Sequence, residues 1–179
     1  TQHELRDHIG YVPQKGTLFT GTIESNLRYA KEDATEEELA KAAEIAQALE
    51  FIEEKPERYE TAITQGGTNV SGGQRQRLSI ARALVKKPEI YIFDDTFSAL
   101  DFKTDAKLRK ALNILCQETK STVLLVAQRI SSIMHAERIV VLDKGEVVGI
   151  GNHEELMKSC EVYQEIAYSQ LSKEELGNE

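Results

Sequence analysis

Apolar positions along the chain recur with two periods, the short period of strands and the longer period of helices. Between residues 103 and 119, Leu108, Leu112 and Leu115 fall on one face, so this segment is predicted to be a helix. Apolar runs precede and follow it, and this order predicts a parallel sheet with right-handed crossovers. The predicted strands of that sheet are Ile90–Phe93, Thr122–Ala127 and Arg138–Leu142, with a further strand at Ile9–Val12 and a hairpin edge strand at Glu146–Ile150.

Three further helices are predicted. Residues 36–54, EEELAKAAEIAQALEFIEE, follow Thr35 and carry leucines and alanines at helical spacing, so one continuous helix is expected there. A second helix begins near Ser71, runs through GGQRQRLSIARALVKK and stops at Pro88. Asn152, with a glutamate three positions later, indicates the start of a last helix at residue 153.

The length of 179 residues allows one domain with a sizeable core. We expect residues 1–170 to form it, with an α/β core at about 1–14 and 89–170 and a helical subdomain at about 15–88. The polar tail at 171–179 is expected to be frayed. Because the chain begins at Thr1 without a methionine or a signal peptide, we also expect it to be a piece of a longer polypeptide.

Composition excludes several classes of function. A net charge of -8 and a pI near 5.2 argue against nucleic acid as a partner, since such binding needs lysines and arginines to neutralise phosphates. The longest apolar stretches, such as residues 121–127, are far shorter than the roughly 20 residues that span a bilayer. Neither Cys116 and Cys160 nor the histidines have metal-ligand spacing, which favours ordinary structural roles and a reducing compartment.

The segment VSGGQRQRL, residues 70–78, places a serine and two glycines at the start of a helix. The Ser71 hydroxyl, the unhindered N–H groups of Gly72 and Gly73 and the positive end of the helix dipole together suit an anion. A glycine turn with a serine cap explains the same residues, and on this segment alone both interpretations stand.

The segment IYIFDD, residues 90–95, is a buried strand that ends in Asp94 and Asp95. Ligands bind at the carboxyl edge of parallel sheets, and an aspartate there can hold Mg²⁺ while the ion bridges phosphate oxygens. A strand-end turn is the alternative.

Taken together, the two segments resemble the ATP-binding cassette (ABC) family, whose signature motif, Walker B strand and D-loop occur in this order. YVPQ resembles the Q-loop, VLLVAQR stands at the switch-loop position, and TLFTGTIESNLRYA resembles exporter cassettes. The resemblance extends over nearly the whole chain. It implies an α/β fold, with a P-loop NTPase-like (RecA-like) parallel sheet and an inserted α-helical subdomain.

The resemblance also implies roles for single residues. The signature would clamp the γ-phosphate of an ATP held by a second cassette, Asp94 would serve Mg²⁺, and Gln14 would touch the metal and the attacking water. Asp95 and Gln128 would stand at the catalytic positions, and residues 98–101 would form the D-loop across the dimer seam. The implied ATP-contacting residues are Ser71, Gly72, Gly73, Gln74, Ser98 and Asp101.

Three departures from the family pattern change this picture. No G-x-x-x-x-G-K-[ST] occurs; Gly16 and Gly21 have the right spacing, but Thr22 stands where lysine is required, so the N-terminal part of the domain is expected to lie outside the chain. Asp95 replaces the glutamate that polarises water, and a misplacement of about 1 Å can cost about 100-fold in rate. Gln128 replaces the switch histidine and has no imidazole to exchange a proton. A slow site with an intact signature is the pattern of heterodimeric exporters, and a homodimer with two slow sites is the alternative.

The function expected from the sequence is therefore ATP-driven export, with a second cassette and transmembrane domains as partners, at the cytoplasmic face of the cell membrane. Two alternatives remain open: a soluble ABC ATPase of DNA repair or translation, and a dimerisation module without activity of its own. The arginines of the signature helix, Arg75, Arg77 and Arg82, are expected on a solvated or ion-paired face. Phe19 and Tyr29 suit either a groove for a membrane-domain helix or ordinary packing.

Overall fold

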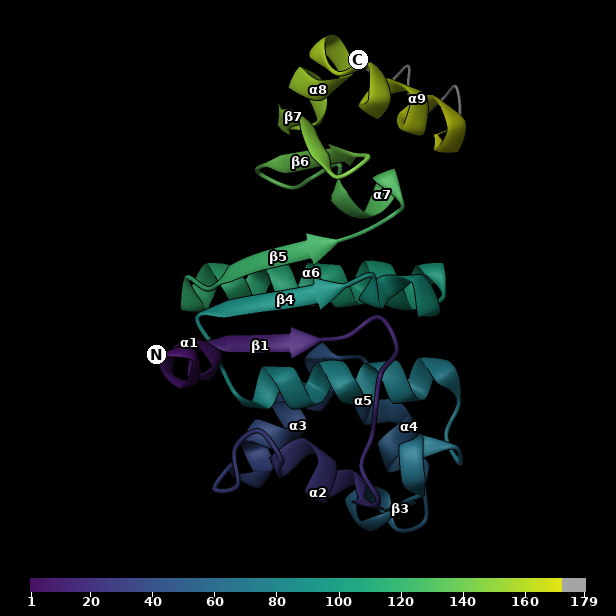
Figure 1. Cartoon of the computed structure of the whole chain (residues 1–179). Coiled ribbons are helices and arrows are strands. Elements are labelled where there is room, and N and C mark those ends of the chain that lie inside the picture. Colours follow the sequence, from purple (N-terminus) through teal and green to yellow (C-terminus); the bar gives the residue numbers. More distant parts are fainter. Residues whose placement is uncertain (172–179) are drawn as a thin grey trace. The chain divides into compact units, whose positions relative to one another are not determined.

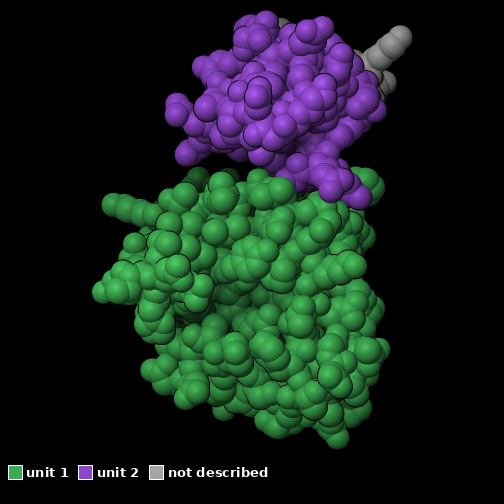
Figure 2. Space-filling view, viewed as in Figure 1, with its two compact units in different colours: residues 1–126 green, residues 127–179 purple. Residues whose placement is uncertain are grey.

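The chain forms two compact units in a computed structural model that describes residues 1–171. The first unit is Thr1–Val126, and the second begins at Ala127 (Figure 2). Within the described residues, no helix is both long enough and apolar enough to cross a membrane. All of the predicted tail except Leu171 lies outside the described residues.

A three-stranded parallel sheet with the strand order β1-β4-β5 organises the first unit (Figure 1). Helices α5 and α6 contribute leucines to the same core as this sheet, and a small antiparallel pair, β2 and β3, lies among the first helices. The elements of this unit are α1 (Gln2–Asp7), β1 (Ile9–Val12), β2 (Gly21–Thr22), α2 (Ile23–Arg28), α3 (Glu36–Ile45), α4 (Leu49–Glu53), η1 (Arg58–Glu60), β3 (Ala62–Ile63), η2 (Gln65–Gly67), α5 (Gly72–Val85), β4 (Ile90–Asp94), η3 (Thr96–Ala99), α6 (Phe102–Thr119) and β5 (Thr122–Val126).

One face of the sheet is buried because side chains alternate along each strand. Val12, Tyr91 and Phe93 on that face are at most 1% exposed, and the rings of Tyr91 and Phe93 stack with centroids 6.1 Å apart. Burial raises the pKa of Tyr91 to about 12. Leu78 of α5 and Leu108 of α6 are fully buried in the same cluster, so the two helices cover this face.

The helix predicted from Ser71 is confirmed as α5. Its capping box is complete: Gln74 N–H donates to Ser71 Oγ over 3.2 Å, and Ser71 N–H donates to Gln74 Oε1 over 3.1 Å. Lys87 follows the helix with a left-handed backbone, φ 51°, and Pro88 then leads into β4.

The single helix predicted for residues 36–54 is wrong, because the chain breaks between α3 and α4. Gln47 has φ 56°, in the left-handed region, and Ala48 N–H donates to Ala43 O over 2.7 Å. Ala43, Ala46 and Ala48 are all fully buried. The turn therefore buries alanines on both sides of the break, which a straight helix with one apolar stripe would not do.

The second unit is a β-hairpin with short helices. It consists of α7 (Ile130–Ile133), β6 (Ile139–Asp143), β7 (Glu146–Gly151), α8 (His153–Ser159) and α9 (Glu161–Gln170). Lys144 and Gly145, with φ of 48° and 84°, form the two-residue turn that the hairpin needs. The hairpin strand predicted at residues 146–150 is confirmed, since β7 pairs antiparallel with β6. The assignment of residues 138–142 to the parallel sheet is wrong, because β6 and β7 form a separate two-stranded sheet. The predicted cap at Asn152 is confirmed, since Glu155 N–H donates to Asn152 Oδ1 over 2.9 Å.

Candidate functional site

Two carboxylates stand at the carboxyl end of the central strand of the sheet. Asp94 ends β4 opposite Val126 of β5, and Asp95 follows it with a left-handed backbone, φ 43°. Aspartate is among the few residues other than glycine that adopt this conformation readily. Asp95 N–H donates to Val126 O over 2.9 Å, which fixes the start of the turn.

Each carboxylate accepts a hydrogen bond from the β1 strand or the loop after it. Tyr11 Oη donates to Asp94 Oδ2 over 3.0 Å, and Gln14 Nε2 donates to Asp95 Oδ2 over 3.0 Å. The hydrogen bond to Asp94 raises the pKa of Tyr11, so the phenol stays a donor. The structure thus brings Gln14, Asp94 and Asp95 together.

The motifs in the sequence did not indicate a role for Tyr11. The alternation of side chains along strands could have indicated this residue. Tyr11 pairs with Ile92, which lies two positions before Asp94 and therefore on the same face of β4. The Tyr11 hydroxyl, on the neighbouring strand and two register positions before Asp94, is within reach of that carboxylate.

The segment after the carboxylates uses its polar side chains locally. Ser98 Oγ donates to Asp95 O over 2.8 Å, and Asp101 caps α6 by accepting from Thr104 N–H over 2.9 Å and from Thr104 Oγ1 over 2.7 Å. The hydrogen bonds from the Thr104 backbone and hydroxyl lower the pKa of Asp101. Asp101 and Ser98 remain exposed, so both can still meet another molecule.

The N-terminus of α5 is open at its first residues. Ser71 and Gly72 are exposed, a Cβ on Gly72 would meet nothing within 4 Å, and one on Gly73 would lie 3.7 Å from Ala99 O. The serine-cap interpretation is therefore correct for this structure, and the exposed helix start is also compatible with an anion.

Gln128 belongs to the second unit, where its backbone carbonyl accepts a hydrogen bond from Gln170 Nε2 over 2.8 Å. Its role at the carboxylates stays a prediction.

The expectation of a solvated or ion-paired arginine face on α5 is wrong. All three arginines are half-buried and donate to backbone carbonyls, and two of them also lie over aromatic rings. Burial lowers the pKa of Arg77 and Arg82. Arg75 reaches Gly66 O and Gly67 O, Arg77 reaches Gln47 O and the Phe51 ring, and Arg82 reaches Thr17 O and the Phe19 ring.

The oxygen ligands of the candidate site suit Mg²⁺ only if phosphate oxygens complete the coordination. Among the described residues, no group of three or more histidines, cysteines or acidic residues is placed to hold a metal by itself. Mg²⁺ prefers oxygen ligands and is usually held by one or two carboxylates together with water and phosphate oxygens. Asp94 and Asp95, with the Gln14 amide beside them, supply such oxygens.

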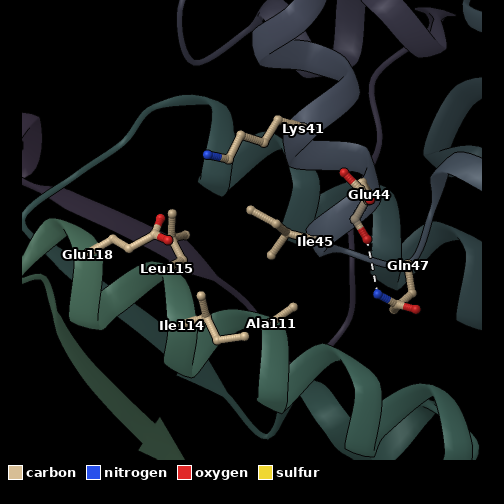
Figure 3. A pocket seen from close by; sticks show the side chains of 8 residues that line it. All are labelled: Lys41, Glu44, Ile45, Gln47, Ala111, Ile114, Leu115 and Glu118. Atoms are coloured by element: carbon tan, nitrogen blue, oxygen red, sulfur yellow. Dashed lines mark hydrogen bonds between the residues drawn. The ribbon is translucent and has the colours of Figure 1, made fainter.

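A shallow hollow of about 300 Å³ between α3 and α6 contains none of these residues (Figure 3). Ile45, Ile114 and Leu115 give it an apolar floor, and Lys41 and Glu118 are among the charged residues at its edge. The hollow offers neither an open helix N-terminus nor paired carboxylates at a sheet edge, so it is not part of the candidate site.

The fold and the site define an α/β protein of the P-loop NTPase type, with paired carboxylates at the sheet edge and an open helix N-terminus. The family model described as ABC transporter matches residues 1–98, and the chain belongs to this family.

Several proteins are similar to the chain. The uncharacterized ABC transporter ATP-binding protein YfiB of Bacillus subtilis is 44% identical over 170 residues, which are 95% of this chain and 29% of YfiB. The ATP-dependent lipid A-core flippase of Desulfotalea psychrophila is 47% identical over 164 residues, which are 92% of this chain and 28% of the flippase. The chain therefore spans less than a third of these relatives.

A solved structure of a bacterial Atm1-family ABC exporter with ATP bound matches 97% of this chain and 30% of that protein, with 35% identity and a TM-score of 0.91. The predicted fold class is confirmed by this match.

Proposed function

We propose that the chain is the nucleotide-binding part of an ABC exporter, which binds ATP with Mg²⁺ at a dimer interface and couples binding and hydrolysis to export. The observation that carries this proposal is the bond from Gln14 to Asp95 beside Asp94, at the carboxyl end of β4. The family membership and the ATP-bound Atm1-family exporter support it.

In this proposal each group has a separate task. Asp94, held by Tyr11, would accept Mg²⁺ directly or through water, and Gln14 would orient a water next to Asp95. Bound Mg²⁺ supplies neutralisation of charge on the phosphate oxygens. The N–H groups at the start of α5 would donate to the γ-phosphate of an ATP held by a second cassette, since helix N-termini favour anions.

The proposed site of this chain is slow. The side chain of Asp95 is one methylene shorter than that of glutamate, and its Oδ2 already accepts from Gln14 Nε2, so its reach toward a water is shorter. General-base assistance contributes roughly 10² to 10⁴ in rate, and a misplaced base loses part of it. Because α5 begins with an intact Ser-Gly-Gly, the chain would complete a competent site of a different partner subunit.

The proposed contact with transmembrane domains is an aromatic pair, Phe19 on the loop after β1 and Tyr29 at the end of α2. The ring centroids of Phe19 and Tyr29 lie 4.5 Å apart, and the two residues are 44% and 67% exposed. The Arg82 guanidinium lies over the Phe19 ring, 5.2 Å from its centroid. An exposed aromatic pair of this kind suits the apolar face of a partner helix. This contact would place the chain at the cytoplasmic face of the membrane.

The proposal needs a phosphate-binding P-loop from elsewhere in the whole transporter. Exposed apolar residues on the described strands support a contribution from other parts of the transporter. Leu124 and Val126 of β5 are 55% and 49% exposed, and Leu142 of β6 is 66% exposed. Exposed apolar strands are normally covered by another element.

The experiment is ATP hydrolysis by the whole transporter with Gly72→Ala and, separately, Asp95→Asn. Gly72→Ala introduces a methyl into open space on a helix, so the chain keeps or gains stability. We nevertheless expect turnover to fall about tenfold or more, because the methyl obstructs close approach of a phosphate. Normal turnover of this variant would contradict a phosphate at the start of α5.

Asp95→Asn preserves the left-handed backbone preference and an acceptor for Gln14. We expect turnover to stay within about threefold of the unmodified protein, because the competent site would use the partner's base. A fall in ATP turnover of about 100-fold would identify Asp95 as a working base and would contradict the proposal of one slow and one competent site.

A further inference from the structure

A buried amide fastens the loop after β1 to helix α5. Gln76 is 2% exposed; its Oε1 accepts from Gly16 N–H over 2.7 Å, and its Nε2 donates to Pro13 O over 3.1 Å. The two backbone groups stand on either side of Gln14. One side chain of α5 therefore holds both ends of the short loop that carries Gln14.

The loop also approaches α5 too closely for any residue larger than glycine at position 16. A Cβ there would lie 2.8 Å from Gln76 Oε1, 2.8 Å from Ser79 Oγ and 3.1 Å from Arg75 O. One turn further along α5, Arg82 Nη2 donates to Thr17 O over 2.9 Å. Close packing and three hydrogen bonds thus join the loop to one face of the helix.

The same helix begins at the proposed phosphate-contacting residues. Gln76 lies five positions after Ser71, and a helix is rigid over that distance. At its other side the fastened loop presents Gln14 to Asp95. A displacement of the start of α5 would therefore move the Pro13 and Gly16 backbone, and with it Gln14.

We infer that Gln76 is a positioning residue that transmits movement of the signature end of α5 to Gln14, and so links the nucleotide site of the partner to the carboxylates of this chain. The inference rests on the proposed function, since the movement it transmits is caused by ATP bound against α5. It assigns to Gln76 a regulatory role at that same site.

The variant that tests it is Gln76→Met, which keeps the length of the side chain and removes both hydrogen bonds. Ser79→Ala is the matched control: Ser79 is on the same helix and 2% exposed, and its hydroxyl has no hydrogen-bond partner among the described residues. The readout is amide hydrogen exchange in the whole transporter, followed for the peptide that contains Gly16 and for the peptide that contains residues 71–74, with and without Mg²⁺ and a non-hydrolysable ATP analogue.

Without nucleotide, we expect the Gly16 amide to exchange about tenfold faster or more in Gln76→Met, because it loses a buried acceptor. With nucleotide, we expect the unmodified protein and Ser79→Ala to gain protection in both peptides. In Gln76→Met, the peptide with residues 71–74 keeps this gain and the loop peptide loses it.

An equal nucleotide response of the loop in Gln76→Met and in the unmodified protein would overturn the inference and leave Gln76 as a packing residue. A nucleotide response in neither peptide of the unmodified protein would overturn the proposed function, and the inference with it. Protection lost in both peptides of Gln76→Met, with Ser79→Ala unaffected, would also overturn selective transmission to the loop.

Discussion

Neighbouring residues at the end of β4 are held by different parts of the chain. Asp94 accepts from Tyr11 on the adjacent strand, and Asp95 accepts from Gln14 in the loop. The sequence predicted Asp94, Asp95 and Gln14 because motif spacing identifies them. It did not predict Tyr11 or the buried role of Gln76, since a hydrogen bond between distant residues depends on strand register and helix rotation, which spacing within one segment does not fix.

Tyr11→Phe isolates one hydrogen bond at this scale. The ring stays, but the hydroxyl that donates to Asp94 Oδ2 is lost, so the carboxylate is oriented less firmly. We expect the whole transporter with ATP to bind Mn²⁺, in place of Mg²⁺, about tenfold more weakly. Electron paramagnetic resonance of free Mn²⁺ in a titration measures this affinity directly.

Tyr168→Phe, an exposed tyrosine on α9, is the control for loss of a phenol hydroxyl. If Tyr11 acts through Asp94, Tyr11→Phe has no further effect in an Asp94→Asn background. Equal Mn²⁺ affinity of Tyr11→Phe and the unmodified protein contradicts the prediction.

At the scale of elements, helix starts were predictable and helix interruptions were not. Ser71 and Asn152 begin helices as expected, because their side chains cap backbone N–H groups within three residues. The break at Gln47 depends on the burial of Ala46 and Ala48 against the rest of the core, which is tertiary information. Helix boundaries that depend on local hydrogen bonds can therefore be predicted from the sequence, whereas breaks that depend on tertiary packing cannot.

The start of α3 gives a prediction about pH. Glu38 caps this helix and accepts from Lys87 Nζ over 2.6 Å and from Lys31 Nζ over 2.9 Å. Hydrogen bonds from Lys87, then Lys31, then the Thr35 backbone lower the pKa of Glu38 from 4.5 to about 2. A lowered pKa stabilises the folded state above the unfolded value, so this contribution is complete above about pH 5.5 and is lost as the pH falls toward 2.

The measurement is urea unfolding of the chain between pH 2 and pH 7, compared with Glu38→Gln. We expect the difference in unfolding free energy to be constant above about pH 5.5 and to shrink as the pH falls from there toward 2. Glu36→Gln, in the same first turn and exposed, is the control for loss of a helix-dipole charge. A difference that does not change with pH excludes the ionised Glu38 as its source.

At the scale of the whole molecule, the sequence predicted the parallel sheet and the hairpin strand at residues 146–150, but it wrongly assigned residues 138–142 to the parallel sheet. Parallel pairing of β1, β4 and β5 joins segments far apart in the sequence, and the order of strand, helix and strand around residues 103–119 predicted such a sheet. The pairing of β6 with β7 follows instead from the local turn at Lys144 and Gly145. The extent of the domain, residues 1–170, and its helical subdomain stay predictions.

The proposed pairing of one slow and one competent site is tested by introducing the family residues at both departing positions, with Asp95→Glu and Gln128→His in the whole transporter. Glutamate extends the carboxylate by one methylene, toward the position from which it can polarise a water, and histidine restores a group that can exchange a proton. Because one competent site would then become two, we expect steady-state ATP turnover to rise up to about twofold.

Gln128→His alone is the control and is expected to leave turnover unchanged, since the base would still be short. The left-handed backbone at position 95 suits aspartate better than glutamate, so a thermal unfolding midpoint is measured alongside. Unchanged turnover of a stable double variant contradicts a site that is slow because of these two residues. If Gln128→His alone raises ATP turnover, the residue at the switch position limits the rate, and Asp95 is an adequate base.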